Sequence, residues 1–408
     1  MRLLVYEHVS GGGYADEVIP SGVLSEGFGM LRTLISDFKA AGYSVITTLD
    51  SRIAKLNPPI GADCVLPVFS SKDAQAKLQK SAEQVDVTYV IAPETNSVLQ
   101  SLVELVDQTG TTSLNCSASA IEKASDKAIF YDFVNKMELR TPETMTFSIA
   151  DDLKEIKKTV QGSYPLIFKP VNGVSGCGLS IIRNQDHVAD AIGKIKKENS
   201  GTQFLAQELI KGVAASVSLL STGNEAMAIS LNRQDVKLET PIASSSYNGG
   251  LVPFDHQLRT KAFEVAEKIV ESFRELKGYI GVDFVLTEDE AVAMEVNPRL
   301  TTSYVGLRSV ASFNIPQAIV NAVLKREFPM HVKNRCYACF SKLETPNPST
   351  GALQRTYAMR EVVSPPFPVS ETNVVSSLIA VHGATSEEAE ARCREAKKRV
   401  FGTISGGN

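Results

Sequence analysis

Several features that define common classes of protein are missing from this chain of 408 residues. Its 42 lysines and arginines do not exceed its 46 aspartates and glutamates, and the net charge is −4. Binding to nucleic acid or to an anionic membrane surface is therefore not expected. No apolar run approaches the roughly 18 residues of a membrane-spanning helix. Residues 1–6 become polar too early for a signal peptide and are typical of a buried strand, so we expect a cytoplasmic protein.

Cysteine is also scarce, with six residues spread over the whole chain. In a long chain without a secretion signal we expect them to be reduced thiols. Cys336 and Cys339 form a Cys-x-x-Cys pair, but a zinc site needs two further ligands, and only the distant Cys393 and His382 could supply them. We therefore predict that Cys336 and Cys339 lie in a half-buried strand.

Two glycine-rich phosphate-binding motifs are missing as well, Gly-x-Gly-x-x-Gly and Gly-x-x-x-x-Gly-Lys-Ser/Thr. Residues 1–115 instead alternate short apolar runs, at 3–9, 43–49, 63–68 and 87–91, with helical patterns such as 25–41. This alternation predicts an α/β domain with a doubly wound parallel sheet. The loop 10–13 follows the first strand, where such sheets bind ligands. Without the fingerprint we expect a flexible loop or a substrate contact there, and Glu17 is a further candidate.

The pattern of the chain changes near residue 115 and again near residue 330. Residues 116–330 mix helices with short strands, which is typical of an α+β module, and end in a predicted helix at 315–325. Residues 331–408 carry further strands, at 335–343 and 378–381, and a last helix at 385–400. Three domains are therefore predicted, over residues 1–115, 116–330 and 331–408.

The most informative segment of the central module runs from residue 281 to residue 299. Two apolar runs flank an acidic turn, which predicts a β-hairpin. If the turn centres on Asp289, Asp283 lies opposite Glu295, and Asn297 shares their face because side chains alternate along a strand. Facing carboxylates repel each other unless a cation lies between them, and such oxygen ligands suit Mg²⁺. We predict that Asp283, Glu295 and Asn297 bind metal. The alternative is a solvated acidic hairpin, but its charges would gather at the turn.

A second set of residues predicts phosphate binding. Lys169 ends an apolar strand, 165–170, where a buried ammonium group requires an anion. A glycine-rich loop and another strand follow, and the backbone N–H groups of such a loop can close over phosphate oxygens. Lys127, at the start of a predicted helix at 128–137, is a second cation. The alternative is a mobile turn without a ligand. The candidate residues of the loop are Gly173, Ser175, Gly176 and Gly178.

These pieces follow one another in the order found in ATP-grasp enzymes, which the chain resembles over roughly residues 117–330. The resemblance implies an ATP-grasp fold with a Rossmann-like pre-ATP-grasp domain at 1–115, a lid subdomain at 116–205 and a metal-binding subdomain at 206–330. Residues 331–408 would be a C-terminal extension that completes the region. Lys127 and Lys169 would hold the phosphates of ATP, and Arg299 and Lys169 would be catalytic. The acidic site would bind two Mg²⁺ ions, or Mn²⁺. The implied adenine contacts are Gln207, Glu208, Leu209 and Ile210.

Two positions depart from the family pattern. Family members often carry a ribose-binding Glu where this chain has Ala214, and many have an Arg where it has Gly281. Other residues must then contact the ribose and one phosphate. A narrower likeness, to the branch of the family that joins glutamate to tyramine, rests on Val5-Tyr6-Glu7, on Ser216-Val217-Ser218 and on residues 295–302.

The reaction implied by the resemblance joins a carboxylate to an amine at the expense of ATP. The acid attacks the γ-phosphorus to give an acyl phosphate and ADP, and the amine then displaces phosphate to leave an amide. The implied partners are a small carboxylate and a small amine, with glutamate and tyramine or a similar amine as candidates. Residues 247–250 and 301–303 are candidate contacts. A carboxylase or phosphotransferase, a nucleotide-binding sensor without turnover, and a homodimer all stay open.

Overall fold

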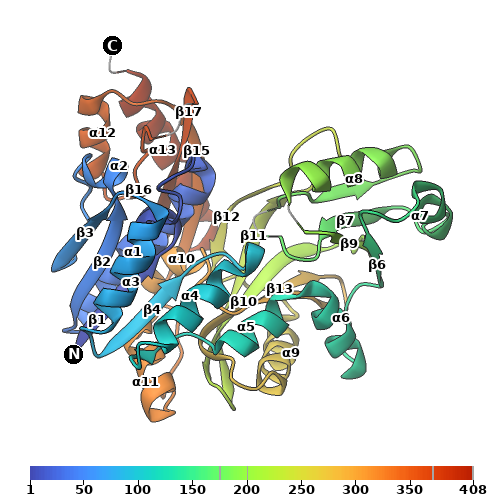
Figure 1. Cartoon of the computed structure of the whole chain (residues 1–408), viewed down its shortest axis with the longest axis horizontal. Helices are drawn as coiled ribbons and strands as arrows, with labels where there is room; N and C mark the ends of the chain where they lie inside the picture. Colours follow the sequence, from blue (N-terminus) through green and yellow to red (C-terminus); the bar gives the residue numbers. More distant parts are fainter. Residues whose placement is uncertain (174–175, 200, 370–371, 407–408) are drawn as a thin grey trace.

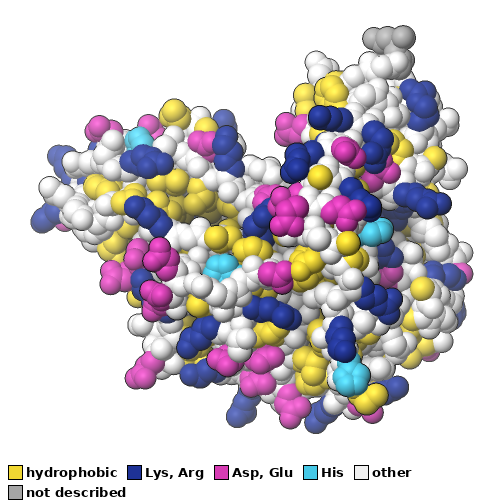
Figure 2. Space-filling view, turned by 180° about the vertical axis from the view of Figure 1, so that it is seen from behind, with side chains coloured by type: hydrophobic (Ala, Val, Ile, Leu, Met, Phe, Trp, Pro, Cys, Tyr) yellow, Lys and Arg dark blue, Asp and Glu magenta, His cyan; other side chains and the backbone are white. Residues whose placement is uncertain are grey.

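The computed structural model of the chain describes residues 1–173, 176–199, 201–369 and 372–406, so that the predicted loop residue Ser175 lies outside the described residues. Three β-sheets organise the molecule, with five, eight and four strands (Figure 1). The five-stranded sheet and the carboxyl-terminal elements lie on one side, and the four-stranded sheet forms a lobe on the other. From behind, the surface is hollowed between these two sides (Figure 2).

The amino-terminal domain is a doubly wound parallel sheet, as predicted, with the order β3-β2-β1-β4-β5. Alternate residues of β1 pack against different helices: Leu3 and Val5 share a core with α1, whereas Leu4 and Tyr6 share one with α3 and α4. Both faces of the sheet are therefore covered. The elements are β1 (Arg2–Glu7), η1 (Val9–Gly13), α1 (Ser21–Ala40), β2 (Ser44–Asp50), α2 (Ser51–Ala54), β3 (Cys64–Val68), α3 (Ser71–Ala82), β4 (Val87–Ile91), η2 (Thr95–Ser97), α4 (Val98–Asp107) and β5 (Thr112–Ser113).

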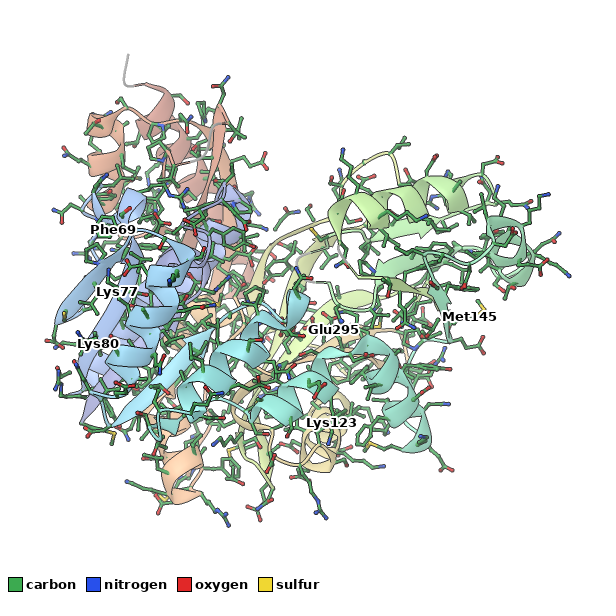
Figure 3. The ribbon with its side chains drawn as sticks, in the orientation of Figure 1. Phe69, Lys77, Lys80, Lys123, Met145 and Glu295 are labelled. Carbon is green, nitrogen blue, oxygen red and sulfur yellow. The ribbon has the colours of Figure 1, made fainter. Side chains whose placement is uncertain are left out.

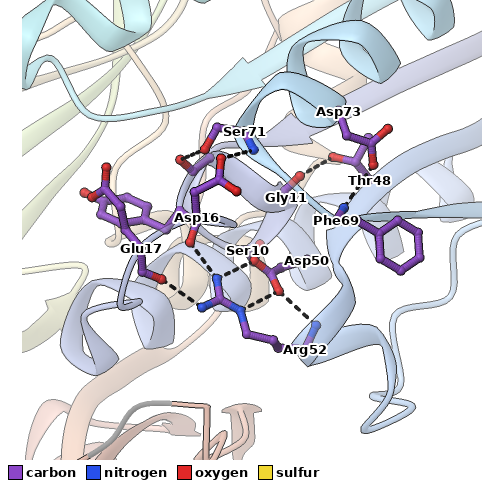
Figure 4. A network of polar contacts seen from close by, with 12 residues as sticks. Ser10, Gly11, Asp16, Glu17, Thr48, Asp50, Arg52, Phe69, Ser71 and Asp73 are labelled. Carbon is purple, nitrogen blue, oxygen red and sulfur yellow. Dashed lines mark hydrogen bonds and ion pairs between the residues drawn. The ribbon is translucent and has the colours of Figure 1, made fainter.

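The loop after β1 is tied to the end of β2 by Arg52 (Figure 4). The guanidinium group of Arg52 lies 2.7 Å from the buried carboxylate of Asp50 and donates to the carbonyl oxygens of Tyr14, at 2.6 Å, and Glu17, at 2.8 Å. Gly12 in this loop has a φ of 104°, and a Cβ atom there would lie 2.3 Å from a side chain of β3. Only glycine fits such a position. The loop is thus packed onto the sheet.

The four-stranded sheet has the order β6-β9-β7-β8 and is antiparallel. Its strands are β6 (Thr144–Ser148), β7 (Leu166–Pro170), β8 (Ser180–Ile182) and β9 (Gln203–Glu208), and its helices are α7 (Leu153–Thr159) and α8 (His187–Glu198). The glycine-rich segment joins β7 to β8, as predicted. Strand β9 runs across the subdomain boundary placed at residue 205, because it pairs with β6 and β7 along its whole length.

The eight-stranded sheet has the order β14-β13-β10-β11-β12-β15-β17-β16. Strand β12 is not predicted from the sequence, because its polar and glycine-rich residues lack the apolar alternation of a strand. Strand β15 pairs with β12, which makes the carboxyl-terminal region continuous with the sheet of the central module. The strands are β10 (Val213–Thr222), β11 (Ala226–Lys237), β12 (Ser246–Val252), β13 (Lys277–Leu286), β14 (Ala291–Asn297), β15 (Tyr337–Pro346), β16 (Val362–Ser364) and β17 (Val374–Gly383).

Helices cover this sheet where its side chains are apolar. Ala262 and Ile269 of α9 share a core with Val217 of β10, and Val400 of α13 packs with Ile379 of β17. Among the residues that the structure describes, no helix combines the length and the apolar character needed to cross a membrane. The remaining helices are α5 (Ala118–Ser125), α6 (Lys127–Lys136), α9 (Arg259–Ser272), α10 (Tyr304–Val310), α11 (Ile315–Lys325), α12 (Thr350–Tyr357) and α13 (Ser386–Ser405).

Candidate active site

The predicted hairpin is formed by β13 and β14, and Asp283 pairs with Glu295 across it, as expected. This pairing depends on a β-bulge. Next to Asp283 the register shifts, so that Phe284 pairs with Ala293 and Met294 is an extra residue. Without the extra residue Met294 would face Asp283, and Glu295 would point to the opposite face of the sheet. The bulge therefore brings the two carboxylates together. Glu295 lies at the centre of the molecule in Figure 3.

Asp283 is hydrogen-bonded by two polar side chains, one from the adjacent strand β14 and one from β11, which β10 separates from β13 in the sheet. The amide of Asn297 donates to Oδ2 at 3.2 Å, and the amide of Gln234 on β11 donates to Oδ1 at 3.1 Å. Burial raises the pKa of Asp283 well above its ordinary value, and the negative charge of Glu295 raises it further. Gln234 escaped the sequence analysis, because only strand pairing brings it beside Asp283.

Glu295 has a more positive environment than Asp283. Its Oε2 lies 3.1 Å from Nζ of Lys127, which also donates to the carbonyl oxygen of Gly173 at 2.9 Å. Burial would raise the pKa of Glu295, but the ammonium groups of Lys127 and Lys169 outweigh that effect and hold it below its ordinary value. Lys169 is buried on β7, and the loss of water lowers its pKa to about 8. Two cations and two anions therefore meet here.

The local sequence explains where Lys127 stands. It is the first residue of α6, and the side chain of the N-cap residue Asp126 accepts hydrogen bonds from the amides of Ala128 and Ile129. This cap fixes the start of the helix and with it the position of Lys127. The prediction of a helix start at this point is confirmed.

The oxygen donors of the hairpin fit a hard divalent cation such as Mg²⁺. Asp283 and Glu295 contribute facing carboxylates, and Asn297 adds an amide oxygen. Burial and the charge of Glu295 raise the pKa of Asp283, so two full negative charges on this buried pair are unfavourable. A bound cation would stabilise both charges. Within the described ranges, no group of three or more His, Cys, Asp or Glu side chains forms a competing metal site.

Arg299 is anchored by a residue that the sequence analysis missed. Its Nε lies 2.9 Å from Oε1 of Glu94, in the segment after β4, and its Nη2 lies 3.5 Å from Oδ1 of Asn297. The side chains of Arg299 and Glu94 are only 16% and 8% exposed. Glu94 thus links the amino-terminal domain to the β13–β14 hairpin through Arg299. No local motif marks Glu94, because its partner lies in another domain.

Two cavities share the Asp283–Glu295 pair as part of their walls. The first, which we name the lysine cavity, has a volume of about 210 Å³ and lies against the β7–β8 hairpin. Oε1 of Gln207 is buried without a hydrogen-bond partner among the described residues, so the cavity offers an unsatisfied polar atom to a ligand. The predicted residues that line it are Lys127, Lys169, Gly173, Gly176, Gln207, Glu208, Leu209, Ile210, Asp283 and Glu295.

Three further residues named in the sequence analysis are Gly178, Glu208 and Ala214. The N–H group of Gly178 donates to Oε2 of Glu198 at 2.7 Å, and Gly178 lines neither cavity. Glu208 reaches the lysine cavity, but its carboxylate lies 3.1 Å from Arg140. Ala214 also lines this cavity and offers no carboxylate there. The described part of the glycine-rich loop therefore contacts the cavity through Gly173, Gly176 and Cys177.

The second cavity, which we name the N-terminal cavity, has a volume of about 220 Å³. On one side it is lined by the metal hairpin and the segment after it, including Arg299 and the predicted candidates Thr301, Thr302 and Ser303, and by Tyr247. On the other side lie the carboxyl ends of β1 and β4 and one face of α1. The candidate Glu17 is not among its lining residues. Those from the amino-terminal domain are Glu7, Val9, Val23, Glu26, Gly27, Met30, Ile91, Ala92 and Pro93.

Three separate regions of the chain meet at Glu26 on the edge of this cavity. Its carboxylate accepts a hydrogen bond from Thr302, at 2.8 Å, and lies 2.8 Å from Nζ of Lys342 on β15. The same ammonium group lies 5.7 Å from the centre of the ring of Tyr247. Glu26 therefore connects α1 with the carboxyl-terminal strand and with the segment after β14.

The Cys-x-x-Cys pair lies away from both cavities. Cys339 is buried in β15 and its thiol shares a hydrogen bond with Cys393 of α13, whereas Cys336 precedes the strand. No described group of cysteine, histidine or acidic side chains surrounds them as metal ligands would. The prediction of a strand is confirmed for Cys339, which is fully rather than half-buried, and is wrong for Cys336, which lies just before β15.

Comparison with known proteins agrees with this architecture. Residues 124–303 match the model of an ATP-grasp domain, and residues 43–121 match that of the pre ATP-grasp 3 domain. The chain is 29% identical to a tyramine–L-glutamate ligase of Methanocaldococcus fervens over 312 residues, which are 76% of this chain and 90% of that protein.

Solved structures extend the comparison of the fold to nearly the whole chain. The L-amino acid ligase of Bacillus licheniformis superposes with a TM-score of 0.70 at 15% identity, covering 97% of each chain. Biotin carboxylase of Campylobacter jejuni gives a TM-score of 0.73 at 16% identity, covering 97% of this chain and 90% of that one. The predicted fold is thus confirmed: the chain carries an ATP-grasp domain preceded by a pre-ATP-grasp domain.

Proposed function

We propose that the protein is an ATP-dependent ligase that joins a carboxylate to an amine through an acyl phosphate. The observation that carries the proposal is the pair of cavities that share the Asp283–Glu295 wall. One cavity contains the two lysines and suits a nucleotide. The other contains neither lysine and leaves room for an acid and an amine next to the same carboxylates. A phosphoryl group at the shared wall would be reached from both sides.

The lysine cavity supplies the contacts that a nucleoside triphosphate needs. Lys127 and Lys169 face the carboxylate of Glu295 and would hold phosphate oxygens, with Gly173 and Gly176 of the β7–β8 loop above them. The segment of Gln207, Glu208, Leu209 and Ile210 would contact the adenine. The unpartnered Oε1 of Gln207 would accept a hydrogen bond from the amino group of the adenine. Ser175 and Gly178 belong to the same proposed loop.

Asp283, Glu295 and Asn297 would hold the metal, for which we propose two Mg²⁺ ions, replaceable by Mn²⁺. When bound, such ions would supply positive charge against the phosphate oxygens. The protein itself then acts mainly by position and charge, because phosphoryl transfer spreads negative charge over oxygen atoms. Arg299, steered by Glu94 toward Asn297, would stabilise that charge from the side of the N-terminal cavity.

Exclusion of water is the second task of the fold, because an acyl phosphate hydrolyses in water. The residues shared by both cavities include Gly176, Leu179, Val236 and Leu238, three of which are apolar side chains around the shared wall. They would shield the activated carboxyl group until the amine attacks its carbonyl carbon and phosphate leaves.

For the substrates we propose glutamate as the acid and tyramine, or a similar primary amine, as the second partner. The curated relatives that match 76% and 81% of this chain, from Methanocaldococcus fervens and Methanocaldococcus jannaschii, are tyramine–L-glutamate ligases. The proposed location is the cytoplasm. For the assembly we propose a homodimer, which sedimentation of the purified protein would test against a monomer.

The test is an assay of the purified protein with ATP, Mg²⁺, glutamate and a panel of amines that includes tyramine. We expect ADP release only when acid and amine are both present, and an amide product whose mass equals acid plus amine less water. Release of ADP with bicarbonate as the only acceptor would instead identify a carboxylase. Nucleotide binding without ADP release over a broad panel would identify a sensor.

A further inference from the structure

The carboxylate of Glu7, at the end of β1, lies in the wall of the N-terminal cavity and is only 2% exposed. It accepts hydrogen bonds from the amide of Val9, at 3.0 Å, and from the amide and the hydroxyl group of Ser10, at 2.7 and 2.6 Å. Three donors hold this carboxylate in place, two of them on Oε2 and one on Oε1. Oε1 therefore keeps capacity for a further donor.

The other carboxylates around this cavity differ from Glu7, because each has either a lysine as its partner or a proposed role in metal binding. Glu26 is paired with Lys342, at 2.8 Å, and Glu295 with Lys127, at 3.1 Å. Asp283 belongs to the proposed metal site. For Glu7, the described part of the chain supplies no lysine, arginine or histidine within ion-pair distance. Burial raises the pKa of Glu7, because its charged form loses water, and the hydrogen bonds from Val9 and Ser10 offset this only in part. A cation from outside the chain would stabilise the charged carboxylate there.

Helix α1 is shaped around this carboxylate. A Cβ atom at Gly27 would lie 2.6 Å from Oε1 and 2.7 Å from Oε2 of Glu7. Glycine in the interior of a helix is less favourable than alanine. At Gly27 the close approach of the Glu7 carboxylate excludes any larger residue, and Gly27 itself lines the cavity.

Apart from Glu26, which is already paired with Lys342, the side chains that the amino-terminal domain places in the cavity with Glu7 are apolar. Six side chains of the amino-terminal domain line this end, from the turn after β1, from α1 and from the end of β4: Val9, Val23, Met30, Ile91, Ala92 and Pro93. A strongly hydrated inorganic cation would lose its water against such a wall without gaining other oxygen ligands. An ammonium group attached to a hydrophobic body would satisfy both the carboxylate and the wall.

From this geometry, and resting on the proposed function, we propose that the end of the N-terminal cavity around Glu7 binds the second substrate, a primary amine with an aryl or alkyl body, in its ammonium form. Glu7 is the counter-ion of the ammonium group, and the apolar residues of η1, of α1 and of the end of β4 contact the body.

A purely structural role of Glu7 makes a different prediction. Its hydrogen bonds to Val9 and Ser10 also stabilise the turn η1, and this alone could explain a buried carboxylate. In that case the cavity would not distinguish a charged ligand from a neutral one of the same shape.

The first experiment uses the unmodified protein without ATP and measures equilibrium binding by calorimetry. The probes are two matched pairs, tyramine with tyrosol and hexylamine with hexanol, in which a hydroxyl group replaces the ammonium group. We expect at least one amine to bind about tenfold or more tightly than its alcohol, the size of a charge-assisted hydrogen bond. If neither amine binds more tightly than its alcohol, the proposal is wrong.

The second experiment compares Glu7→Gln with Glu361→Gln, which removes a carboxylate that lines neither cavity and is paired with Arg399. Glu7→Gln should abolish the preference for the amine while the affinity for Mg-ADP stays unchanged, and Glu361→Gln should alter neither. If Glu7→Gln does not fold, Gly27→Ala is the second variant, since its methyl group displaces the carboxylate. A retained preference in the folded variant contradicts the proposal.

These measurements separate the two proposals. If no acid and amine release ADP, the ligase function fails, yet the calorimetric preference for the amine still tests the site at Glu7. If turnover occurs and Glu7→Gln raises KM for ATP but not for the amine, the ligase stands and the assignment of Glu7 is wrong.

Discussion

The lysine cavity and the N-terminal cavity share one wall but are built in different ways. The lysine cavity is formed by residues that recur in recognisable local patterns: a capped helix start at Lys127, a strand ending in Lys169 and the glycine loop after it. The N-terminal cavity draws on β1, α1, β4, β12 and the segment after β14. The first is the proposed nucleotide site and depends on local motifs, whereas the second is the proposed acceptor site and depends on how the domains pack. Each therefore predicts a different response to mutation.

Removing a carboxylate from the wall that the two cavities share should impair the function of both. Glu295→Ala removes a proposed metal ligand that also balances Lys127 and Lys169. We expect kcat to fall by roughly 10³-fold or more, because a bound metal contributes several kcal/mol to the transition state. Circular dichroism and thermal unfolding should stay close to those of the unmodified protein. Glu290→Ala, in the exposed turn of the same hairpin, is the control and should keep its activity. Unfolding of Glu295→Ala at ordinary temperature would indicate a structural role instead.

A mutation confined to the lysine cavity should change nucleotide binding alone. Lys169→Ala removes a buried ammonium group, and we expect the Kd of a non-hydrolysable ATP analogue to rise by roughly 30-fold or more, as for the loss of a buried charged hydrogen bond. Amine binding without nucleotide should not change. Lys158→Ala, whose side chain is 78% exposed on α7, is the matched control. An unaltered Kd in Lys169→Ala would remove this lysine from the phosphate site.

The same difference between local motifs and domain packing explains which parts of the fold and of the site could be predicted from the sequence. The hairpin, the two lysines and the parallel sheet were predictable, because periodicity, capping and strand alternation act over a few residues. The pairing of Asp283 with Glu295 was predicted from a turn centred on Asp289, but the structure reaches it through the bulge at Met294. Gln234 and Glu94 could not be predicted, since each meets its partner only through sheet pairing or domain packing. Strand β12 was missed because its polar residues pair with β11 and β15.

The connection between the domains gives the next prediction. Glu94→Gln leaves the guanidinium group of Arg299 buried beside a neutral amide. We expect the free energy of unfolding to fall by about 3 kcal/mol, because breaking a buried ion pair strands its partner. The kcat should fall by about tenfold, because Arg299 loses the charged partner that orients its guanidinium group, and a charged hydrogen bond contributes an effect of that size. Denaturant unfolding and steady-state kinetics measure both. Glu104→Gln, on the exposed face of α4, is the control. An unchanged kcat would show that Glu94 stabilises the fold without positioning Arg299.

The smallest effect is expected at the edge of the N-terminal cavity. Lys342→Met keeps the length of the side chain and removes the ammonium group that pairs with Glu26, at 2.8 Å, near the ring of Tyr247. Thr302 still donates to Glu26, so the fold should survive with a modest loss of stability. Because Lys342 lies outside the lysine cavity, we expect KM for an acceptor substrate to rise about five-fold, the scale of one weakened hydrogen bond, while the Kd for ATP stays constant. Lys333→Met, at an exposed position before β15, is the control. A change in ATP affinity in Lys342→Met would show that the two cavities do not act separately. It would contradict the proposal that one cavity binds the nucleotide and the other the acceptor substrates.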